Sequence, residues 1–348
     1  MNPYILAVLL SGLGLGTTIT LASSHWLLAW MGLEINTLAV LPLMTQNHHP
    51  RAVEATTKYF LIQATAAATL LFASTTNAWL TGQWSIEQMT HPLPTTLITL
   101  ALALKIGLAP VHAWLPEVLQ GLDLTTGLIL STWQKIAPFI LLVQINSPDP
   151  TILMALGLMS TLVGGWGGLN QTQLRKILAY SSIAHLGWMI LIMQFSPTLA
   201  LLALMTYFIM TFSAFLMFKL YKATSINTLA TSWTKAPVIM TLAPLSLLSL
   251  GGLPPFTGFM PKWLILQELT KQGLAATATF AALTALLSLY FYLRLSYAMT
   301  LTVSPNTLTG TTPWRFYSPQ STLPLSMTVV AALSLLPLTP AVAALLTP

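Results

Sequence analysis

Residues 95–116, TTLITLALALKIGLAPVHAWLP, decide the fold of this chain. The stretch starts as an apolar run of the kind that crosses a bilayer, yet it contains Lys105 and two prolines, Pro110 and Pro116. A charge at the bilayer centre costs roughly 2.5–3.5 kcal/mol even on a lenient insertion scale, and proline removes a helical hydrogen bond. The stretch therefore predicts a broken transmembrane helix whose interruption lies beside protein or trapped water.

The composition places the chain among polytopic membrane proteins. Hydrophobic residues make up 55% of the 348 residues and charged residues 6%, with a mean hydropathy of +0.76, whereas soluble domains carry about 25% charged residues. Cysteine is absent, which excludes a disulfide, a thiolate metal site and a cysteine-ligated iron–sulfur cluster. No dinucleotide-binding fingerprint or P-loop occurs either, so we expect no cofactor to be bound by this chain.

Apolar runs of about 20 residues predict eleven transmembrane helices in an all-α protein. They are expected near residues 3–21, 24–45, 58–80, 95–116, 124–145, 151–169, 175–194, 197–221, 238–268, 275–297 and 323–345. With this count, nine of the 13 basic residues fall at one face: Arg51, Lys58, Arg175, Lys176, Lys219, Lys222, Lys235, Arg294 and Arg315. Lys271 falls at the opposite face, and three lysines lie within spans. The bias follows the positive-inside rule, so the net charge needs no nucleic-acid partner to explain it.

A second interruption, GLPPFTGFMP at residues 252–261, begins with the same Gly-Leu-x-Pro pattern as the first. The first break lies in the fourth expected helix and the second in the ninth. Because this offset of five helices is odd, a five-helix repeat must be inverted relative to its partner, as in many transporters. The expected domains are a first repeat at 1–145 broken near 107–116, an inverted second repeat at 150–297 broken near 251–262, and a loop with one final transmembrane helix at 298–348.

Four segments carry a resemblance to a known family: MGLEIN at 31–36, KIGLAPVHAWLPEV at 105–118, TWQKIAP at 132–138 and LRKILAYSSIAH at 174–185. Through them the chain resembles the antiporter-like, proton-pumping membrane subunits of respiratory complex I, the NADH:ubiquinone oxidoreductase. More broadly it is similar to Mrp-type cation/proton antiporters. The resemblance implies proton translocation across the mitochondrial inner membrane, coupled to electron transfer from NADH to ubiquinone. Relatives with fourteen helices have three that precede the first repeat, whereas eleven helices are expected here.

The resemblance implies a buried proton-transfer axis of glutamate, lysine and histidine. It implies that Glu34 pairs with Lys105, that Lys135 is the central lysine, that Lys262 lies at the exit end, and that His112 and His185 lie near the axis. Such residues suit proton transfer because the proton affinity of a buried lysine responds to burial and to nearby charge, whereas arginine stays protonated. Imidazoles titrate near neutral pH and can relay protons through water.

The resemblance also implies which components lie elsewhere. NADH, FMN, the iron–sulfur clusters and ubiquinone are expected in other subunits of the complex. The expected partners are adjacent antiporter-like and small hydrophobic membrane-arm subunits, supernumerary subunits, and phospholipids including cardiolipin at the basic face.

Two other functions stay open from the sequence: a scaffold subunit with a vestigial ion path, and a freestanding cation/proton antiporter. The antiporter would need a cation site, yet no aspartate and only one glutamate, Glu34, is expected in the middle of a span. The scaffold makes the buried glutamate and lysine a structural pair and predicts that neutral replacements of the lysines are tolerated.

Overall fold

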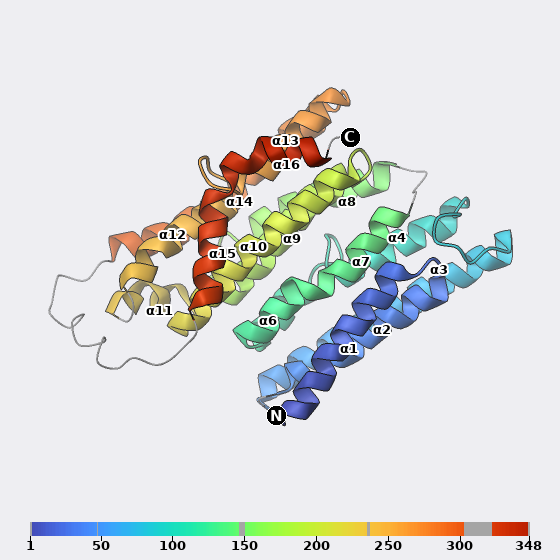
Figure 1. Ribbon diagram of the computed structural model, residues 1–348, viewed down its shortest axis with the longest axis horizontal. Coiled ribbons are helices and arrows are strands. Elements are labelled where there is room, and N and C mark those ends of the chain that lie inside the picture. The colour runs from blue at the N-terminus through green and yellow to red at the C-terminus, as the bar shows by residue number, and fades with distance from the viewer. Residues whose placement is uncertain (1, 47, 146–149, 235–236, 303–321, 347–348) are drawn as a thin grey trace. The chain divides into compact units, whose positions relative to one another are not determined.

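The structure is a computed structural model that describes residues 2–46, 48–145, 150–234, 237–302 and 322–346, and these residues are helical apart from their connecting loops (Figure 1). Eight helices in this part of the chain are long and apolar enough to cross a membrane, or nine if the bent pair at residues 323–342 is one span. The expectation of an all-α membrane protein is therefore confirmed. The chain divides into two compact units, Met1–Gly157 and Leu158–Pro348.

The first unit is built on a close crossing of its first two helices. Its elements are α1 (Pro3–Ala22), α2 (Trp26–Met44), α3 (Pro50–Thr81), α4 (Pro92–Ile106), α5 (Trp114–Gly121), α6 (Leu124–Ser131), α7 (Trp133–Gln144) and the start of α8 (Pro150–Gly167). A Cβ atom on Gly16 of α1 would lie 2.8 Å from the carbonyl oxygen of Gly32 of α2, so small residues let the two backbones touch. α7 packs against α1, α2 and α4, and α3 packs against α2, α4 and α5.

The first broken helix ends and restarts as the prolines and glycine predict. α4 stops at Gly107, which adopts a left-handed φ of 86°, and the Leu108 amide reaches back 2.9 Å to the Ala103 carbonyl. This is the hydrogen-bond pattern of a Schellman motif. The break spans residues 107–113 and contains a cis peptide bond between Ala109 and Pro110.

The second unit surrounds α10. Its elements after α8 are α9 (Leu174–Met193), α10 (Pro197–Tyr221), α11 (Ile226–Ala230), η1 (Thr231–Thr234), α12 (Pro237–Gly251), α13 (Phe259–Lys271), α14 (Ala275–Leu301), α15 (Leu323–Ser334), η4 (Leu336–Leu338) and α16 (Thr339–Leu346). α10 packs against α9, α12, α13 and α15. α12 ends in the same way as α4: Gly252 has a φ of 79°, and the Leu253 amide bonds to the Leu248 carbonyl at 3.3 Å.

The helix expected at 124–145 is observed as one membrane-length span, Leu124–Gln144, with a single irregular residue, Thr132, between α6 and α7. Two other expected helices differ from those observed. The single final helix expected at 323–345 is bent by 60°, because Pro337 and Pro340 each remove a backbone donor there. The helix expected at 58–80 starts earlier, at Pro50, where proline is favoured in the first turn.

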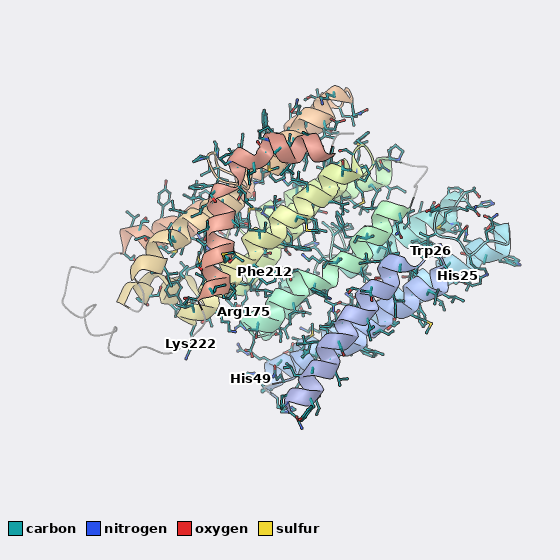
Figure 2. All side chains as sticks on the ribbon, viewed as in Figure 1. His25, Trp26, His49, Arg175, Phe212 and Lys222 are labelled. Carbon is teal, nitrogen blue, oxygen red and sulfur yellow. The ribbon has the colours of Figure 1, made fainter. Side chains whose placement is uncertain are left out.

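Basic residues gather at one end of the second unit. Backbone bonds from Leu174 to Thr224 and from Ile226 to Thr172 join the start of α9 to the loop after α10. This brings Arg175 and Lys222 to the same end of the unit (Figure 2). Lys235 and Arg315, also expected at the basic face, lie outside the described residues.

Candidate functional site

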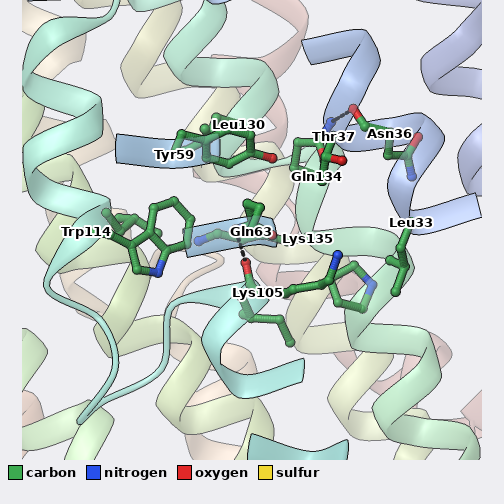
Figure 3. A pocket seen from close by; sticks show the side chains of 13 residues that line it. Leu33, Asn36, Thr37, Tyr59, Gln63, Lys105, Trp114, Leu130, Gln134 and Lys135 are labelled. Carbon is green, nitrogen blue, oxygen red and sulfur yellow. Dashed lines mark hydrogen bonds between the residues drawn. The ribbon is translucent and has the colours of Figure 1, made fainter. Parts of the chain in front are cut away.

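A small polar cavity lies inside the first unit, between α2, α3, the two halves of the first broken helix, α6 and α7 (Figure 3). Its volume is about 20 Å³, and a cavity of roughly 10–15 Å³ already holds one water molecule. Two of the lysines singled out by the sequence line it. The full lining is Leu33, Asn36, Thr37, Tyr59, Gln63, Lys105, Ile106, Trp114, Leu115, Leu130, Gln134, Lys135 and Pro138.

Lys105 is held in the last turn of α4, directly before the break. Its side chain is 7% exposed, and among the described residues its ammonium nitrogen has no hydrogen-bond partner. The carbonyls freed at the end of α4 are satisfied by neighbouring side chains: Gln63 Nε2 donates to the Lys105 carbonyl at 3.3 Å, and Trp114 Nε1 donates to the Leu104 carbonyl at 3.1 Å. The helix end is thus fixed by α3 and α5, while the ammonium remains available to the cavity.

Lys135 enters the cavity from the first turn of α7. Its side chain is 2% exposed. The neighbouring Gln134 Nε2 donates to the Asn36 carbonyl at 3.4 Å, which ties α7 to α2. Asn36 also lines the cavity, and its Oδ1 is buried without a hydrogen-bond partner within the described part of the chain. The Asn36 carboxamide packs against Gly16 of α1. Buried polar groups are satisfied in most proteins, and a water in a cavity of this size can accept a hydrogen bond from the Lys105 ammonium.

Glu34 lies near this cavity but does not line it. It is half-buried on α2, and its carboxylate accepts a hydrogen bond from Thr37 Oγ1 at 3.1 Å. Glu34 is close enough to Lys105 for an electrostatic interaction. The direct ion pair that the resemblance implies is nevertheless not formed between these two described residues, since the Lys105 ammonium makes no hydrogen bond.

The other three predicted residues lie outside the cavity. His112 is half-buried in the first break, with Nδ1 3.2 Å from the Pro110 carbonyl oxygen. In the second unit, the buried ring of His185 on α9 contacts Tyr207 of α10, with 5.6 Å between ring centroids. Lys262, in the first turn of α13, donates from Nζ to the Gly251 carbonyl at 2.7 Å. The structure therefore brings together Lys105 and Lys135, with Glu34 beside them.

The neutral polar lining of the cavity was not predicted from the sequence. Asn36, Gln63 and Gln134 carry carboxamides in the middle of apolar runs, which is the signal that could have found them, because polar side chains in a membrane face the bundle interior. Tyr59 and Trp114, whose rings are 5.8 Å apart, gave no such signal, since aromatic residues are common in spans.

Comparison with known proteins identifies the family. Residues 23–288 match the family described as NADH:quinone oxidoreductase/Mrp antiporter, transmembrane region, and residues 289–343 match the NADH dehydrogenase subunit 2 C-terminus. The chain belongs to the NADH:quinone oxidoreductase/Mrp antiporter family. NADH-ubiquinone oxidoreductase chain 2 of Tetraodon nigroviridis is 75% identical over 342 residues, which are 98% of each chain. The same protein of Salmo salar is 72% identical over the full length of both chains.

Solved structures of this family share the fold. The chain is similar to one in respiratory complex I from Thermus thermophilus with bound aureothin, with a TM-score of 0.86 and 30% identity, covering 99% of this chain and 79% of that one. A chain of the Mrp complex from Dietzia sp. has a TM-score of 0.79 at 18% identity, with 95% of this chain and 76% of that one covered. The latter shows the fold alone.

These relatives confirm the expected function. The chain is an antiporter-like, proton-translocating membrane subunit of complex I, with several membrane-spanning helices in the mitochondrial inner membrane. Other complex I subunits are accordingly its partners. Within the described residues, no group of histidine, aspartate and glutamate is arranged to hold a metal ion.

Proposed function

We propose that protons cross this subunit by way of the cavity that Lys105 and Lys135 share. The observation that carries the proposal is the meeting of two buried lysines from α4 and α7 at one water-sized polar cavity. Burying an ion costs several kcal/mol after relaxation. Two ammonium groups beside the same small cavity also repel each other. The arrangement therefore favours passage of a single proton from one lysine to the other through water.

In this proposal Glu34 controls when Lys105 releases its proton. While its carboxylate contacts Lys105, the pair keeps both groups charged, because opposite charges stabilise each other. When the Glu34 carboxylate and the Lys105 ammonium are not in direct contact, as in the structure, Lys105 lacks its counter-ion. In this proposal it then passes its proton toward Lys135. Asn36, Gln63 and Gln134 hold the cavity open and polar without competing for the proton, since carboxamides are neutral.

The proposal extends to the number and arrangement of the spans. We infer eleven spans: the nine helices or bent pairs above, plus the shorter apolar helices Pro92–Ile106 and Ile239–Gly251, each completed by the helix after its break. Residues 1–145 and 150–297 would form inverted repeats, supported by the matching ends of α4 and α12, and residues 298–348 would add the last span. His112, His185 and Lys262 would extend the axis beyond the cavity.

Lateral cover is needed for a protein with broken spans, because backbone groups freed within a membrane must be shielded from lipid. Adjacent antiporter-like, small hydrophobic and supernumerary subunits would supply it. Arg175, Lys176, Lys219 and Lys222, at one end of the second unit, would bind anionic phospholipid head groups such as those of cardiolipin.

The test is proton translocation per NADH oxidised by intact complex I in proteoliposomes, comparing wild type with Lys135→Met. Methionine keeps most of the length of the side chain and removes its charge. We expect normal electron transfer and a reduced ratio of protons to NADH, whereas Lys271→Met, at the exposed end of α13, should keep the wild-type ratio. An unchanged ratio in assembled Lys135→Met complex would favour a scaffold with a vestigial path.

Glu34→Gln in the same assay tests whether Glu34 controls proton release from Lys105. An unchanged ratio of protons to NADH in this variant would remove Glu34 from the proposed mechanism.

A further inference from the structure

The second broken helix is bridged by one of its own side chains. Lys262 lies in the first turn of α13, after the break, and its side chain turns back toward α12. Its Nζ donates a hydrogen bond of 2.7 Å to the carbonyl of Gly251, the last residue of α12. One lysine thereby joins the two halves of the helix across residues 252–258.

The end of α12 has a carbonyl that needs this donor. The Leu248 and Ser249 carbonyls accept bonds from the backbone amides of Leu253 and Gly252. The Gly251 carbonyl lies beyond them and receives the lysine instead. Inside a membrane, an unpaired backbone carbonyl costs several kcal/mol, so the side chain replaces a bond that the break has removed.

Gly252 leaves the space that Lys262 occupies. A Cβ atom at this position would lie 2.8 Å from Lys262 Nζ, 2.9 Å from Cδ and 3.0 Å from Cε. Almost no real Cβ atom has neighbours this close, so a side chain at residue 252 and the bridging lysine exclude each other. The glycine thus serves both the left-handed turn, with its φ of 79°, and the passage of the lysine.

Within the described part of the second unit, no carboxylate lies beside the charge of Lys262. Glu268 is the only acidic residue from position 158 to position 348, and its carboxylate pairs with Lys271 at 3.4 Å. α12 carries no titratable residue, α14 places Tyr292 against Gly251, and His185 of α9 contacts Tyr207 of α10. The partial negative charge at the C-terminus of α12 is therefore the counter-charge that the geometry supplies to Lys262.

We propose that Lys262 is a charge-dependent clamp, a positioning residue that holds the two halves of the second broken helix together while it carries its proton. A charged donor makes a hydrogen bond roughly twice as strong as a neutral one, so loss of the proton loosens the break. The clamp itself is independent of the proposed proton path. Its coupling to proton passage rests on that proposed function, because there a proton must leave Lys262.

The clamp can be tested by amide hydrogen exchange, followed by mass spectrometry, in intact complex I. In Lys262→Met, we expect the amides of residues 252, 253 and 256–259 to exchange roughly tenfold faster or more, the effect of losing a bond to a charged group. Lys262→Arg, which keeps the charge and the donors, should restore protection. The matched control is Lys271→Met, at the other end of α13, which should exchange at the wild-type rate. Wild-type protection in Lys262→Met would overturn the clamp.

A second variant and a second measurement distinguish the possible outcomes. If Lys262→Met assembles poorly, Lys262→Gln keeps a neutral donor and should give an intermediate increase in exchange; wild-type protection in that variant would overturn the charge dependence. Proton translocation per NADH is measured in the same complexes. Faster exchange with an unchanged ratio would support the clamp and remove Lys262 from the proposed path, whereas unchanged exchange with a reduced ratio would keep the path and overturn the clamp.

Discussion

The two broken helices share a backbone solution and differ in the group that completes it. Both α4 and α12 end at a glycine with positive φ, followed by a leucine whose amide reaches back five residues. In the first break the donors to the freed carbonyls are neutral, the Gln63 carboxamide and the Trp114 indole, whereas in the second break the donor is the ammonium of Lys262. The geometry of a break and its charge are therefore set by different residues.

Corresponding positions in the two breaks carry charges that point in different directions. When Gly107 is aligned with Gly252, Glu117 takes the place of Lys262. Glu117 points outward, is 55% exposed and pairs with Lys58 at 2.9 Å, while Lys262 turns inward to the backbone. The first break leaves its buried charge on Lys105, before the glycine, where the ammonium faces a cavity. One break thus leaves its lysine facing a cavity, and the other has its lysine bonded across the break.

The largest difference between the breaks should appear when each glycine receives a methyl group. Gly107→Ala and Gly252→Ala both place a side chain in a left-handed conformation, which costs about 1–2 kcal/mol. In Gly252→Ala the new Cβ also displaces Lys262, whereas in Gly107→Ala its nearest neighbour is the flexible end of Leu115, at 2.9 Å. We expect the temperature at which assembled complex I loses activity to fall in both variants, and by several degrees more in Gly252→Ala. Equal losses would mean that the Lys262 contact adds nothing to stability.

A smaller effect is expected from removing one neutral donor of the first break, the Trp114 indole. Trp114→Phe keeps an aromatic ring beside Tyr59 but leaves the Leu104 carbonyl without its indole partner. A buried group left unpaired costs about 1–3 kcal/mol, so amide exchange should quicken at residues 104–108, where α4 ends. Trp133→Phe is the matched control, because its indole bond to Leu13 is longer, at 3.4 Å, and its side chain is 43% exposed. If both variants exchange at the wild-type rate, then cavity water can replace the indole.

The sequence was sufficient to predict the breaks because their causes are local. Glycine and proline within an apolar run remove backbone hydrogen bonds wherever the chain is placed, and Gly107 and Gly252 indeed mark the ends of α4 and α12. Lys105 and Lys135 could be selected for a related reason, since the cost of a charge in a membrane depends on its position along a span. These predictions thus rest on properties that neighbours in sequence determine.

Contacts between distant segments could not be predicted in this way. The bond from Gln63 to the Lys105 carbonyl joins α3 to α4, and the bond from Gln134 to Asn36 joins α7 to α2. No local pattern fixes which helices meet. The inward turn of Lys262 was missed for the same reason: its acceptor lies eleven residues earlier, across a break whose path the sequence does not determine.

The smallest effect should come from Glu117→Gln, which removes the outward charge of the first break. Lys58 would keep its second partner, Glu54, at 2.9 Å, and both members of the lost pair are largely exposed. Exposed pairs contribute little because water and salt screen them. We therefore expect the thermal stability of complex I to match wild type at physiological salt, with any loss confined to low salt. A loss of thermal stability as large as that of Gly252→Ala at both salt concentrations would show that the ion pair between α3 and α5 stabilises the first break as Lys262 stabilises the second. Both breaks would then depend on a charge, one outside and one inside.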